Sequence, residues 1–447
     1  CALPISVYLL LARDFAPAQE RIESVVARLR DIPRFLADAR VVLAEMSGIH
    51  VETAIAQLAG FPGILDQAAL LARETDRESE LAEVSSAAAE EVEEFRSWLA
   101  ARAPESRRDP RLGVRLYSAA LWHNLDEEIA PIQVLEAAER HLDDITTRMR
   151  EVAAQFTGES VRAPDVVRRA LARIADEYPV DDSSVLSLVR DGLERATDFV
   201  RERNLVSIPD VDTRIIEMPE FRRGVAVAYC DAPGPLEQAS VPTYVAVAPT
   251  PADWSRDRVD SFYREYNGIL LHDLTIHEAM PGHVLQLAHA RAIASPSRVR
   301  RFGMSGVFAE GWAVYAEELM VERGYAPDER LDAHLRLRLQ QLKMQARMAI
   351  NAILDARVHG GDIDEREALE LMTRRGFQEE GEAVGKWRRA LLTATQLPTY
   401  FVGWLRIREI VDDLRVLHPE WTDARIHDLV LAHGAPGPRH LRTLLGL

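Results

Sequence analysis

The spacing of apolar residues constrains this chain more than any other feature, because it repeats every three or four positions over most of the sequence. Clear examples are residues 21–46, 80–102 and 135–156. Such spacing puts the apolar side chains on one face of an α-helix, which must be buried against other elements. The chain has 447 residues, 47% of them hydrophobic, which is enough for a large core. The sequence therefore predicts a mainly α-helical fold.

One segment, residues 206–252, breaks the helical pattern with β-branched runs that Pro and Gly punctuate. We predict short strands near 213–218, 224–230 and 243–248. The helical pattern returns at about 253 and continues to the end of the chain. The sequence thus divides into a helical scaffold region, a short β segment and a second helical region, at 1–205, 206–252 and 253–447. We expect these regions to form one continuous structural unit.

The charge balance limits the kinds of partner that the surface attracts. The chain carries 54 basic and 71 acidic residues, a formal net charge of −17. An acidic surface repels phosphate backbones, so we expect no nucleic-acid partner. The acidic residues are spread along helical faces, as on a solvated surface. Such a surface admits a cationic or neutral small substrate more easily than an anionic polymer.

Two cysteines, Cys1 and Cys230, are too few for a disulfide framework or a thiolate metal site. We expect Cys230 to be a buried free thiol. No apolar run approaches the roughly 18–20 residues of a spanning helix, so we predict no transmembrane segment. A first residue Cys1 fits either a fragment or a lipid-anchored mature protein. The oligomeric state stays open, and so does the compartment, with the cytoplasm favoured over secretion or a lipid anchor.

The stretch TIHEAMPGHVLQ, residues 275–286, carries two histidines and a glutamate in nearly the order that zinc hydrolases use. In those enzymes two His four positions apart bind zinc from one helix face, and the Glu after the first His activates a metal-bound water. His277 and Glu278 fit this scheme. His283 follows His277 by six positions, which in a regular helix is a rotation of about 600° and a rise of about 9 Å. Imidazoles so placed cannot share one ion.

Pro281 and Gly282, between the two histidines, offer a way to bring them together. Pro interrupts helical hydrogen bonding, and Gly permits backbone conformations that other residues avoid. We expect a bulge that absorbs two residues and turns His283 back toward His277. In the alternative interpretation, Pro281 ends one helix, His283 begins another, and both imidazoles are merely hydrogen-bonded.

A third candidate ligand is Glu310, in the apolar stretch FAEGWAVYAEEL. A carboxylate on an apolar helix face is costly unless it is paired or binds a cation. Two His and a Glu from a following helix make a catalytic zinc site with one position open for water, and this ligand set suits zinc best among divalent ions. His272 and His289, which flank the first motif, are alternative ligands if the bulge does not form.

Together these motifs resemble a bacterial family known as domain of unknown function 885. The family signature is His-Glu-x-x-Pro-Gly-His followed by Glu-Gly-Trp-Ala, and both parts are intact here, at 277–283 and 310–313. The resemblance covers most of the chain. Two further family segments, Asp-x-x-x-His and Gln-x-x-x-Tyr-x-x-Gly, are matched by Asp355 and His359 and by Gln396, Tyr400 and Gly403.

The family is in turn similar to helical gluzincin peptidases of the thimet-oligopeptidase and Taq-carboxypeptidase kind. This resemblance implies a large helical metallopeptidase-like body whose catalytic region is 253–447, with the small β segment beside the active-site helix. It also implies that His277, His283 and Glu310 bind one zinc ion and that Glu278 is the general base.

The chain departs from the family pattern at two places. Ala394 and Thr395 stand where Pro-Gly is usual, and Asn351 stands where Arg is common. These departures concern the substrate side of the expected site more than its metal ligands.

Further polar residues have a functional and a structural interpretation each. The resemblance makes Tyr400 the donor to the oxyanion of the tetrahedral intermediate, unless it is a core tyrosine. His359 either contacts the substrate or supports the fold. Arg347 can clamp a carboxylate or form an ordinary ion pair. Asp273 and Glu317 can each orient a ligating imidazole.

Several aromatic residues near the motifs are expected to pack instead of reacting. These are Tyr263, Tyr266, Tyr315 and Trp312, of which Trp312 is expected beside Glu310. The strand candidates GVAVAY and TYVAVAP, at 224–229 and 243–249, either pair with an extended substrate or form a hairpin that covers the helices.

The motifs favour a zinc-dependent hydrolase that cleaves an amide bond, most readily in a short peptide, with Glu278 as the base. Two alternatives stay open. One is a non-catalytic helical binding or scaffold protein with a degenerate metal motif. The other is an amidase or esterase that acts on a small metabolite.

Overall fold

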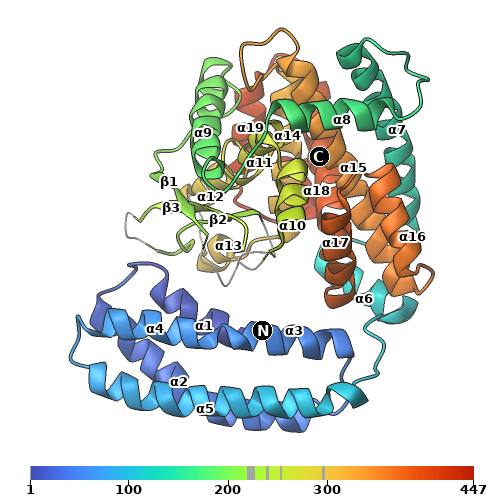
Figure 1. Ribbon diagram of the computed structural model, residues 1–447. Helices are drawn as coiled ribbons and strands as arrows, with labels where there is room; N and C mark the ends of the chain where they lie inside the picture. The colour runs from blue at the N-terminus through green and yellow to red at the C-terminus, as the bar shows by residue number, and fades with distance from the viewer. Residues whose placement is uncertain (1, 219–226, 238–240, 252–253, 294–296) are drawn as a thin grey trace. The chain divides into compact units, whose positions relative to one another are not determined.

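The computed structural model describes the chain except residues 1, 219–226, 238–240, 252–253 and 294–296. It confirms the mainly α-helical prediction, since one three-stranded sheet accompanies many helices in the described residues (Figure 1). The chain forms two compact units. Unit 1 is Cys1–Pro110 with Ala239–Val241, and unit 2 is Arg111–Gln238 with Pro242–Leu447.

Unit 1 is built from amphipathic helices. They are α1 (Ala2–Leu11), α2 (Ala18–Val42), α3 (Gly48–Ala59), α4 (Phe61–Ala72) and α5 (Glu78–Arg102), followed by a short 3-10 turn, η1 (Ala103–Glu105). The long helices α2 and α5 pack on each other. On α2 the buried residues Ile22, Val25, Leu29 and Leu36 follow the predicted three- and four-residue spacing. Pro33 lies inside this helix.

One stretch of unit 1, Gly48–Ala72, is long and apolar enough to cross a membrane by length and composition, with a mean hydropathy of 1.3. We expected no such segment from the sequence. In the structure the stretch forms two helices, α3 and α4, which meet at Gly60. Leu58 and Phe61 are fully buried in the unit 1 core. Core helices of this composition pass the same test, so the finding is weak evidence for a membrane span.

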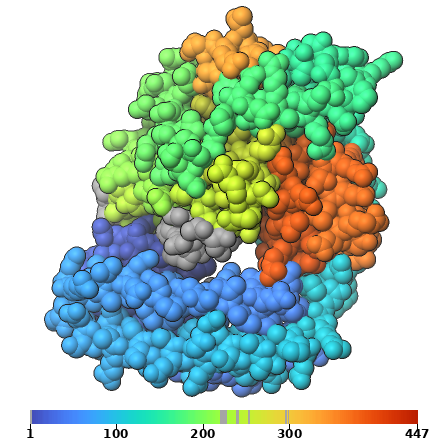
Figure 2. All heavy atoms as spheres, in the orientation of Figure 1, coloured from blue at the N-terminus to red at the C-terminus, as the bar shows by residue number. Residues whose placement is uncertain are grey.

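Unit 2 contains the motifs. The helices before its sheet are α6 (Gly113–Leu125), α7 (Pro131–Thr157), α8 (Val166–Glu177) and α9 (Val185–Glu202). Those after it are α10 (Arg256–Glu265), α11 (Gly268–Glu278), α12 (His283–Ala292), α13 (Arg298–Phe302), α14 (Gly306–Glu322), α15 (Ala333–Gly360), α16 (Glu365–Glu370), the π-helical turn η3 (Leu371–Arg375), α17 (Glu380–Leu392), α18 (Pro398–Leu417), α19 (Asp423–Leu431) and α20 (Pro438–Leu445). In its core α7 packs along α15, and α14 packs along α18. On the face in Figure 2, α10 in yellow-green lies beside the orange residues of α17.

The sheet of unit 2 has the strand order β1-β3-β2. The strands are β1 (Thr213–Glu217), β2 (Ala228–Asp231) and β3 (Thr243–Val247). β1 is parallel to β3, and β2 is antiparallel to β3. The predicted strands near 213–218 and 243–248 are observed. The one predicted at 224–230 overlaps β2, and its residues 224–226 lie outside the described part of the chain.

The compact units divide the chain at residue 110, whereas composition divides it at 205 and 252. The reason lies in the packing of the helices before the sheet. Leu142 of α7, Ile174 of α8 and Val200 of α9 belong to the same core as Trp312 and Leu342. Helical periodicity shows that a face is buried, but it does not show which helix covers that face.

Two glycines let α14 and α18 cross with their backbones in contact. A Cβ atom on Gly311 would lie 2.3 Å from the carbonyl carbon of Gly403, and one on Gly403 would lie 2.1 Å from the carbonyl oxygen of Val307. No side chain fits at either position without moving a helix. The crossing places Glu310 of α14 close to Tyr400 of α18. Glu310 directly precedes Gly311, and Tyr400 lies about one helical turn before Gly403.

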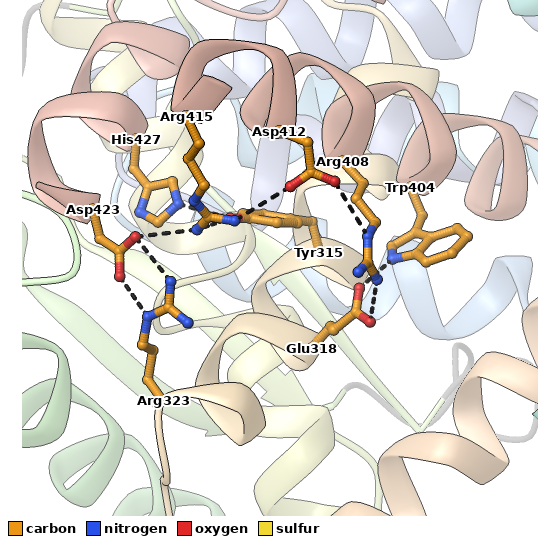
Figure 3. Close-up of polar contacts among 9 residues, drawn as sticks. All are labelled: Tyr315, Glu318, Arg323, Trp404, Arg408, Asp412, Arg415, Asp423 and His427. Atoms are coloured by element: carbon orange, nitrogen blue, oxygen red, sulfur yellow. Dashed lines mark hydrogen bonds and ion pairs between the residues drawn. The ribbon is translucent and has the colours of Figure 1, made fainter. Parts of the chain in front are cut away.

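A network of polar side chains fixes α14 to α18 and α19 (Figure 3). Glu318 of α14 is buried, accepts a hydrogen bond from the Trp404 indole at 2.9 Å, and pairs with Arg408. The hydroxyl of Tyr315 lies 2.8 Å from Nε2 of His427. Near the end of the helix, Arg323 and Arg415 both pair with Asp423. These contacts set the rotation of α14 about its axis and therefore the direction of Glu310.

We expect Gly311→Ala and Gly403→Ala each to lower the free energy of unfolding of unit 2 by roughly 1–3 kcal/mol, because an added methyl group forces two packed helices apart. Thermal unfolding measures the effect as a lower midpoint. The matched control is Gly385→Ala in α17, where nothing lies within 4 Å of the added Cβ. Since Ala favours a helix interior over Gly by about 1 kcal/mol, the control midpoint should stay or rise. Equal midpoints for the three variants would contradict the close crossing.

Candidate metal centre

The two histidines of the first motif lie on two successive helices. The Asn267 side chain accepts a hydrogen bond from the Leu270 N–H and caps the start of α11. That helix ends at Glu278, and α12 begins at His283. The break follows from Pro281, which has no N–H for helical hydrogen bonding. One helix therefore ends before Pro281 and another begins at His283, as in the alternative interpretation of the sequence. The two imidazoles nevertheless converge, as we expected from a bulge.

Gly282 makes the turn between these helices possible. Its N–H donates to the Ile276 carbonyl at 3.0 Å, which folds the chain tightly back on the end of α11. A Cβ atom on Gly282 would lie 1.9 Å from the His277 carbonyl oxygen and 2.3 Å from that of Ile276. Only glycine fits there. The return of His283 toward His277 thus depends on the absence of a side chain at Gly282.

Three side chains converge at the end of α11. Nε2 of His277 lies 3.4 Å from Oε2 of Glu310, and Nε2 of His283 lies 3.5 Å from the same oxygen. The two imidazole rings are nearly perpendicular, with centroids 4.8 Å apart. One ligand atom from each of the three residues lies within 4.8 Å of the other two, so together they could hold a metal ion.

The donor set fits a tetrahedral metal ion. Bonds of 2.0–2.1 Å to zinc place two ligand atoms about 3.3–3.5 Å apart, which matches both measured separations. A charge-assisted hydrogen bond would be shorter, at about 2.7–2.9 Å. Oε2 of Glu310 is also buried and has no hydrogen-bond donor in the described part of the chain. The side chains of His277, His283 and Glu310 keep 13%, 15% and 23% of their surface exposed, so a fourth ligand can enter.

A second layer of contacts supports the three side chains. Oε1 of Glu317, which is buried on α14, lies 2.6 Å from Nδ1 of His277. This bond orients the imidazole so that Nε2 points to the common centre. The indole N–H of Trp312 donates to the Pro281 carbonyl at 2.8 Å, which ties the turn to α14. The same helix thus carries one candidate ligand and holds the other two.

The charges around the centre favour a cation. Burial opposes a charged imidazole, but the carboxylates of Glu310 and Glu317 raise the pKa of His277 well above its ordinary value. Burial likewise opposes the Glu310 carboxylate, and the imidazoles of His277 and His283 hold the pKa of that carboxyl well below its usual range. Burial and the charge of Glu317 raise the pKa of Asp273 well above its usual value.

Glu278 lies beside the centre and contacts the sheet. Its Oε2 accepts a hydrogen bond of 3.0 Å from the backbone N–H of Cys230 in β2. The half-buried Cys230 thus holds the carboxylate through its main chain, with its thiol not involved in that bond. No feature of the sequence indicated this contact, because any residue at position 230 offers the same N–H.

Tyr400 also lies near the centre. Its ring stacks toward that of His277 with centroids 6.5 Å apart. Burial and the Glu310 carboxylate raise the pKa of Tyr400 above its ordinary value, so the phenol keeps its proton at neutral pH. The structure therefore brings together five of the six predicted site residues, namely His277, Glu278, His283, Glu310 and Tyr400.

The sixth, His359, lies elsewhere. It is buried, its Nδ1 accepts from the Leu112 N–H at 3.3 Å, and its Nε2 is 2.9 Å from the Thr393 carbonyl. In the described residues no hydrogen bond, ion pair or ring contact joins it to the centre. The alternative ligands are engaged as well: Nδ1 of His272 lies 3.1 Å from the Tyr325 hydroxyl, and Nε2 of His289 lies 2.7 Å from the Ser207 carbonyl.

Most of the remaining candidates have structural contacts. Arg347 is half-buried and pairs with Glu382, as in the structural interpretation of this residue. Asp273 is buried and has no hydrogen-bond partner in the described residues, so it orients neither imidazole. The hydroxyls of three tyrosines contact neighbouring side chains: Tyr263 bonds Asp182, Tyr266 bonds Arg347 and Tyr315 bonds His427.

The Asp-x-x-x-His segment on α15 holds the connector between α17 and α18. Oδ2 of Asp355 accepts from the Thr395 N–H at 2.9 Å, and His359 bonds the Thr393 carbonyl. Thr395 has φ of 66°, in the left-handed region that glycine enters without strain. This explains why the family pattern has Gly at the position of Thr395, and it makes the departure a local cost in backbone energy.

Comparisons with known proteins agree with the resemblance to the DUF885 family. The family model described as "Bacterial protein of unknown function (DUF885)" matches residues 4–445. A solved structure titled "putative lipoprotein of unknown function" from Shewanella oneidensis is 27% identical, with a TM-score of 0.79 over 99% of this chain and 81% of that one. A "putative lipoprotein" from Colwellia psychrerythraea is 18% identical, with a TM-score of 0.79 over 96% and 76% of the two chains, and shows the fold alone. No curated protein matches.

We expect Gly282→Ala to separate the two imidazoles, because a Cβ so close to two carbonyl oxygens must open the turn. The dissociation constant for zinc should rise by roughly 100-fold, the upper end of the effect of disturbing a ligand's support. Titration of the metal-free protein with zinc against a competing chelator measures the change. Gly306→Ala, where nothing lies within 4 Å of the added Cβ, is the control. Unchanged zinc affinity in Gly282→Ala would contradict the role of the turn.

We expect the stability of unit 2 to depend on pH through Asp355, because burial raises the pKa of that carboxyl to about 6. The folded state binds the proton more tightly than the unfolded chain, whose Asp pKa is about 3.9. The stabilisation is therefore complete below about pH 4 and is lost as the pH rises through 6. Asp355→Asn removes this dependence. The free energy of unfolding of the variant minus that of the native chain should therefore increase by about 3 kcal/mol between pH 4 and pH 8. Parallel curves of thermal midpoint against pH would show that Asp355 does not titrate in this range.

Proposed function

Because this chain belongs to the DUF885 family, a bacterial family of unknown function, we propose its function from the geometry of its own residues. The proposal is a zinc-dependent hydrolase that cleaves amide bonds, most readily in short peptides. The observation that carries it is the convergence of His277, His283 and Glu310 on one point with the carboxylate of Glu278 beside them. A purely structural metal site needs no base next to a ligand, so Glu278 favours catalysis over a scaffold role.

The residues of the site have distinct roles in this reaction. A zinc ion held by the three ligands would supply Lewis acidity toward the carbonyl oxygen and lower the pKa of a water molecule. Glu278 takes one proton from the attacking water as the new C–O bond forms at the carbonyl carbon. It returns that proton to the amine nitrogen as the C–N bond breaks, so one water molecule and one amide give a carboxylic acid and an amine.

The contacts of Glu278 and Tyr400 suit these roles. The Cys230 N–H occupies Oε2 of Glu278 and leaves Oε1 as the oxygen that accepts the proton. Tyr400 stays protonated at neutral pH and faces the centre, so it can donate to the negative charge that develops on the carbonyl oxygen.

Peptides are the preferred substrate class for two reasons. The sheet strand β2 lies next to α11 and contacts Glu278, and an extended peptide is the kind of ligand that lies along a strand. The motif likeness to helical gluzincin peptidases of the thimet-oligopeptidase and Taq-carboxypeptidase kind points the same way.

We expect Glu278→Gln to keep stoichiometric zinc and to lower kcat by roughly 10²–10⁴-fold, because Gln keeps the size of the side chain but cannot accept a proton from water. Atomic absorption measures the metal, and mass spectrometry of a digested pool of short peptides measures cleavage. His283→Ala should lose both zinc and cleavage.

The matched control for that experiment is His289→Ala on the same helix, whose imidazole bonds the Ser207 carbonyl away from the centre. It should keep zinc and cleavage. A native protein that binds no divalent metal would support the scaffold alternative. One that binds zinc and hydrolyses small amides or esters but no peptide would support the metabolite hydrolase.

A further inference from the structure

The Tyr400 hydroxyl takes part in a hydrogen-bonded chain that leads away from the centre. Nε2 of Gln396 donates to the Tyr400 hydroxyl oxygen at 3.3 Å. A hydroxyl has one proton to give and lone pairs to accept with. Since the amide nitrogen of Gln396 has only protons to offer, the Tyr400 proton is not used in this contact.

The orientation of the Gln396 amide is fixed by chemistry and not only by the coordinates. Nη2 of Arg389 on α17 donates to Oε1 of Gln396 at 2.7 Å. A guanidinium has five donors and no acceptor, so the amide oxygen must face Arg389. The amide NH₂ group must then face Tyr400. The charged end of the chain thus determines the direction of every hydrogen bond in it.

The remaining direction for the Tyr400 proton is toward the centre. In the part of the chain that the structure describes, no acceptor is hydrogen-bonded to this hydroxyl. The Glu310 carboxylate is near enough to raise the pKa of Tyr400, and the Tyr400 ring is roughly parallel to that of His277, with centroids 6.5 Å apart. The carbonyl oxygen of a bound substrate is therefore the acceptor that the arrangement leaves open.

The connector that carries Gln396 is held in place by three side chains. It lies between α17 and α18, at 393–397. Asp355 and His359 of α15 bond the connector backbone, and Nδ2 of Asn124 on α6 donates to the Thr395 carbonyl at 2.7 Å. The Asp-x-x-x-His segment therefore supports the connector that carries Gln396, although it does not contact the centre itself.

We propose that Gln396, oriented by Arg389, is a positioning residue that reserves the Tyr400 proton for the carbonyl oxygen of the substrate. This inference rests on the proposed amide hydrolysis. It predicts that the direction of the hydrogen bond between residues 396 and 400 matters more than its presence.

Gln396→Glu tests that direction with almost no change in shape. The new carboxylate pairs with Arg389, so the connector keeps its place, but its second oxygen accepts the Tyr400 proton and turns it away from the centre. We expect kcat to fall by roughly 100-fold, as when a donor to an oxyanion is removed, with KM changed by less than about threefold. Tyr400→Phe should cause the same loss. Gln396→Met, which neither donates nor accepts strongly, should lose less than about 10-fold.

The double variant Gln396→Glu/Tyr400→Phe separates a positioning role from a general structural one. If Gln396 acts through Tyr400, the double variant is no slower than Tyr400→Phe alone. Additive losses, or native kcat in Gln396→Glu, would overturn the proposal. Zinc content by atomic absorption should be equal in all variants.

Binding of a phosphinic peptide, which resembles the tetrahedral intermediate, gives a readout that needs no turnover. Calorimetry on the zinc-loaded proteins should show affinity lowered by roughly 100-fold in Gln396→Glu and in Tyr400→Phe, and no further in the double variant. If the native protein neither cleaves peptides nor binds this analogue, the proposed hydrolase fails and the positioning role fails with it. If the native protein does both and Gln396→Glu matches it, only the positioning role fails.

Discussion

The close approach of main chains at three glycines is the constraint on which the candidate centre depends. Gly282 lets the chain turn back against the carbonyl oxygens at the end of α11, while Gly311 and Gly403 let α14 and α18 touch. The first contact brings the two imidazoles together, and the second sets Glu310 and Tyr400 on facing helices. A methyl group at any of these positions would occupy space that backbone atoms already fill. The geometry of the site thus depends on the absence of a side chain at these three positions, whereas the ligand residues supply its chemistry.

The site also depends on two buried carboxylates of α14, which are stable only when suitable partners face them. Glu317 and Glu318 are neighbours on α14, both 2% exposed, and point to different partners. Glu317 holds His277, and Glu318 holds Trp404 and Arg408 of α18. Removing a carboxylate from water costs several kcal/mol unless partners replace the water. A helix whose two buried carboxylates face opposite partners has one rotational setting, and that setting points Glu310 at the histidines.

The family segments of the sequence acquire separate tasks in the structure. The His-Glu and Glu-Gly-Trp segments form the centre, and Trp312 also ties the turn at Pro281 to α14. The Asp-x-x-x-His segment does not reach the centre but fixes the connector that carries Gln396. His359, for which the sequence left both a substrate contact and a structural role open, bonds two backbone groups, the Leu112 N–H and the Thr393 carbonyl. From sequence the two roles look alike, because both require a polar residue on an otherwise apolar helix face.

The helical class, the strands at 213–217 and 243–247, and the three residues that converge could all be predicted from the amino-acid sequence. This was possible because helix and strand periodicity and the chemistry of His and Glu are local properties. The sequence did not predict the division into units at residue 110 or the Cys230 contact to Glu278, and it did not predict that Asp273 would lack a hydrogen-bond partner among the described residues. These depend on which surfaces meet, and amphipathic helices of similar composition can meet in many ways. These features follow from tertiary packing, because the sequence does not show which group will lie next to a backbone N–H or which helix will cover an apolar face.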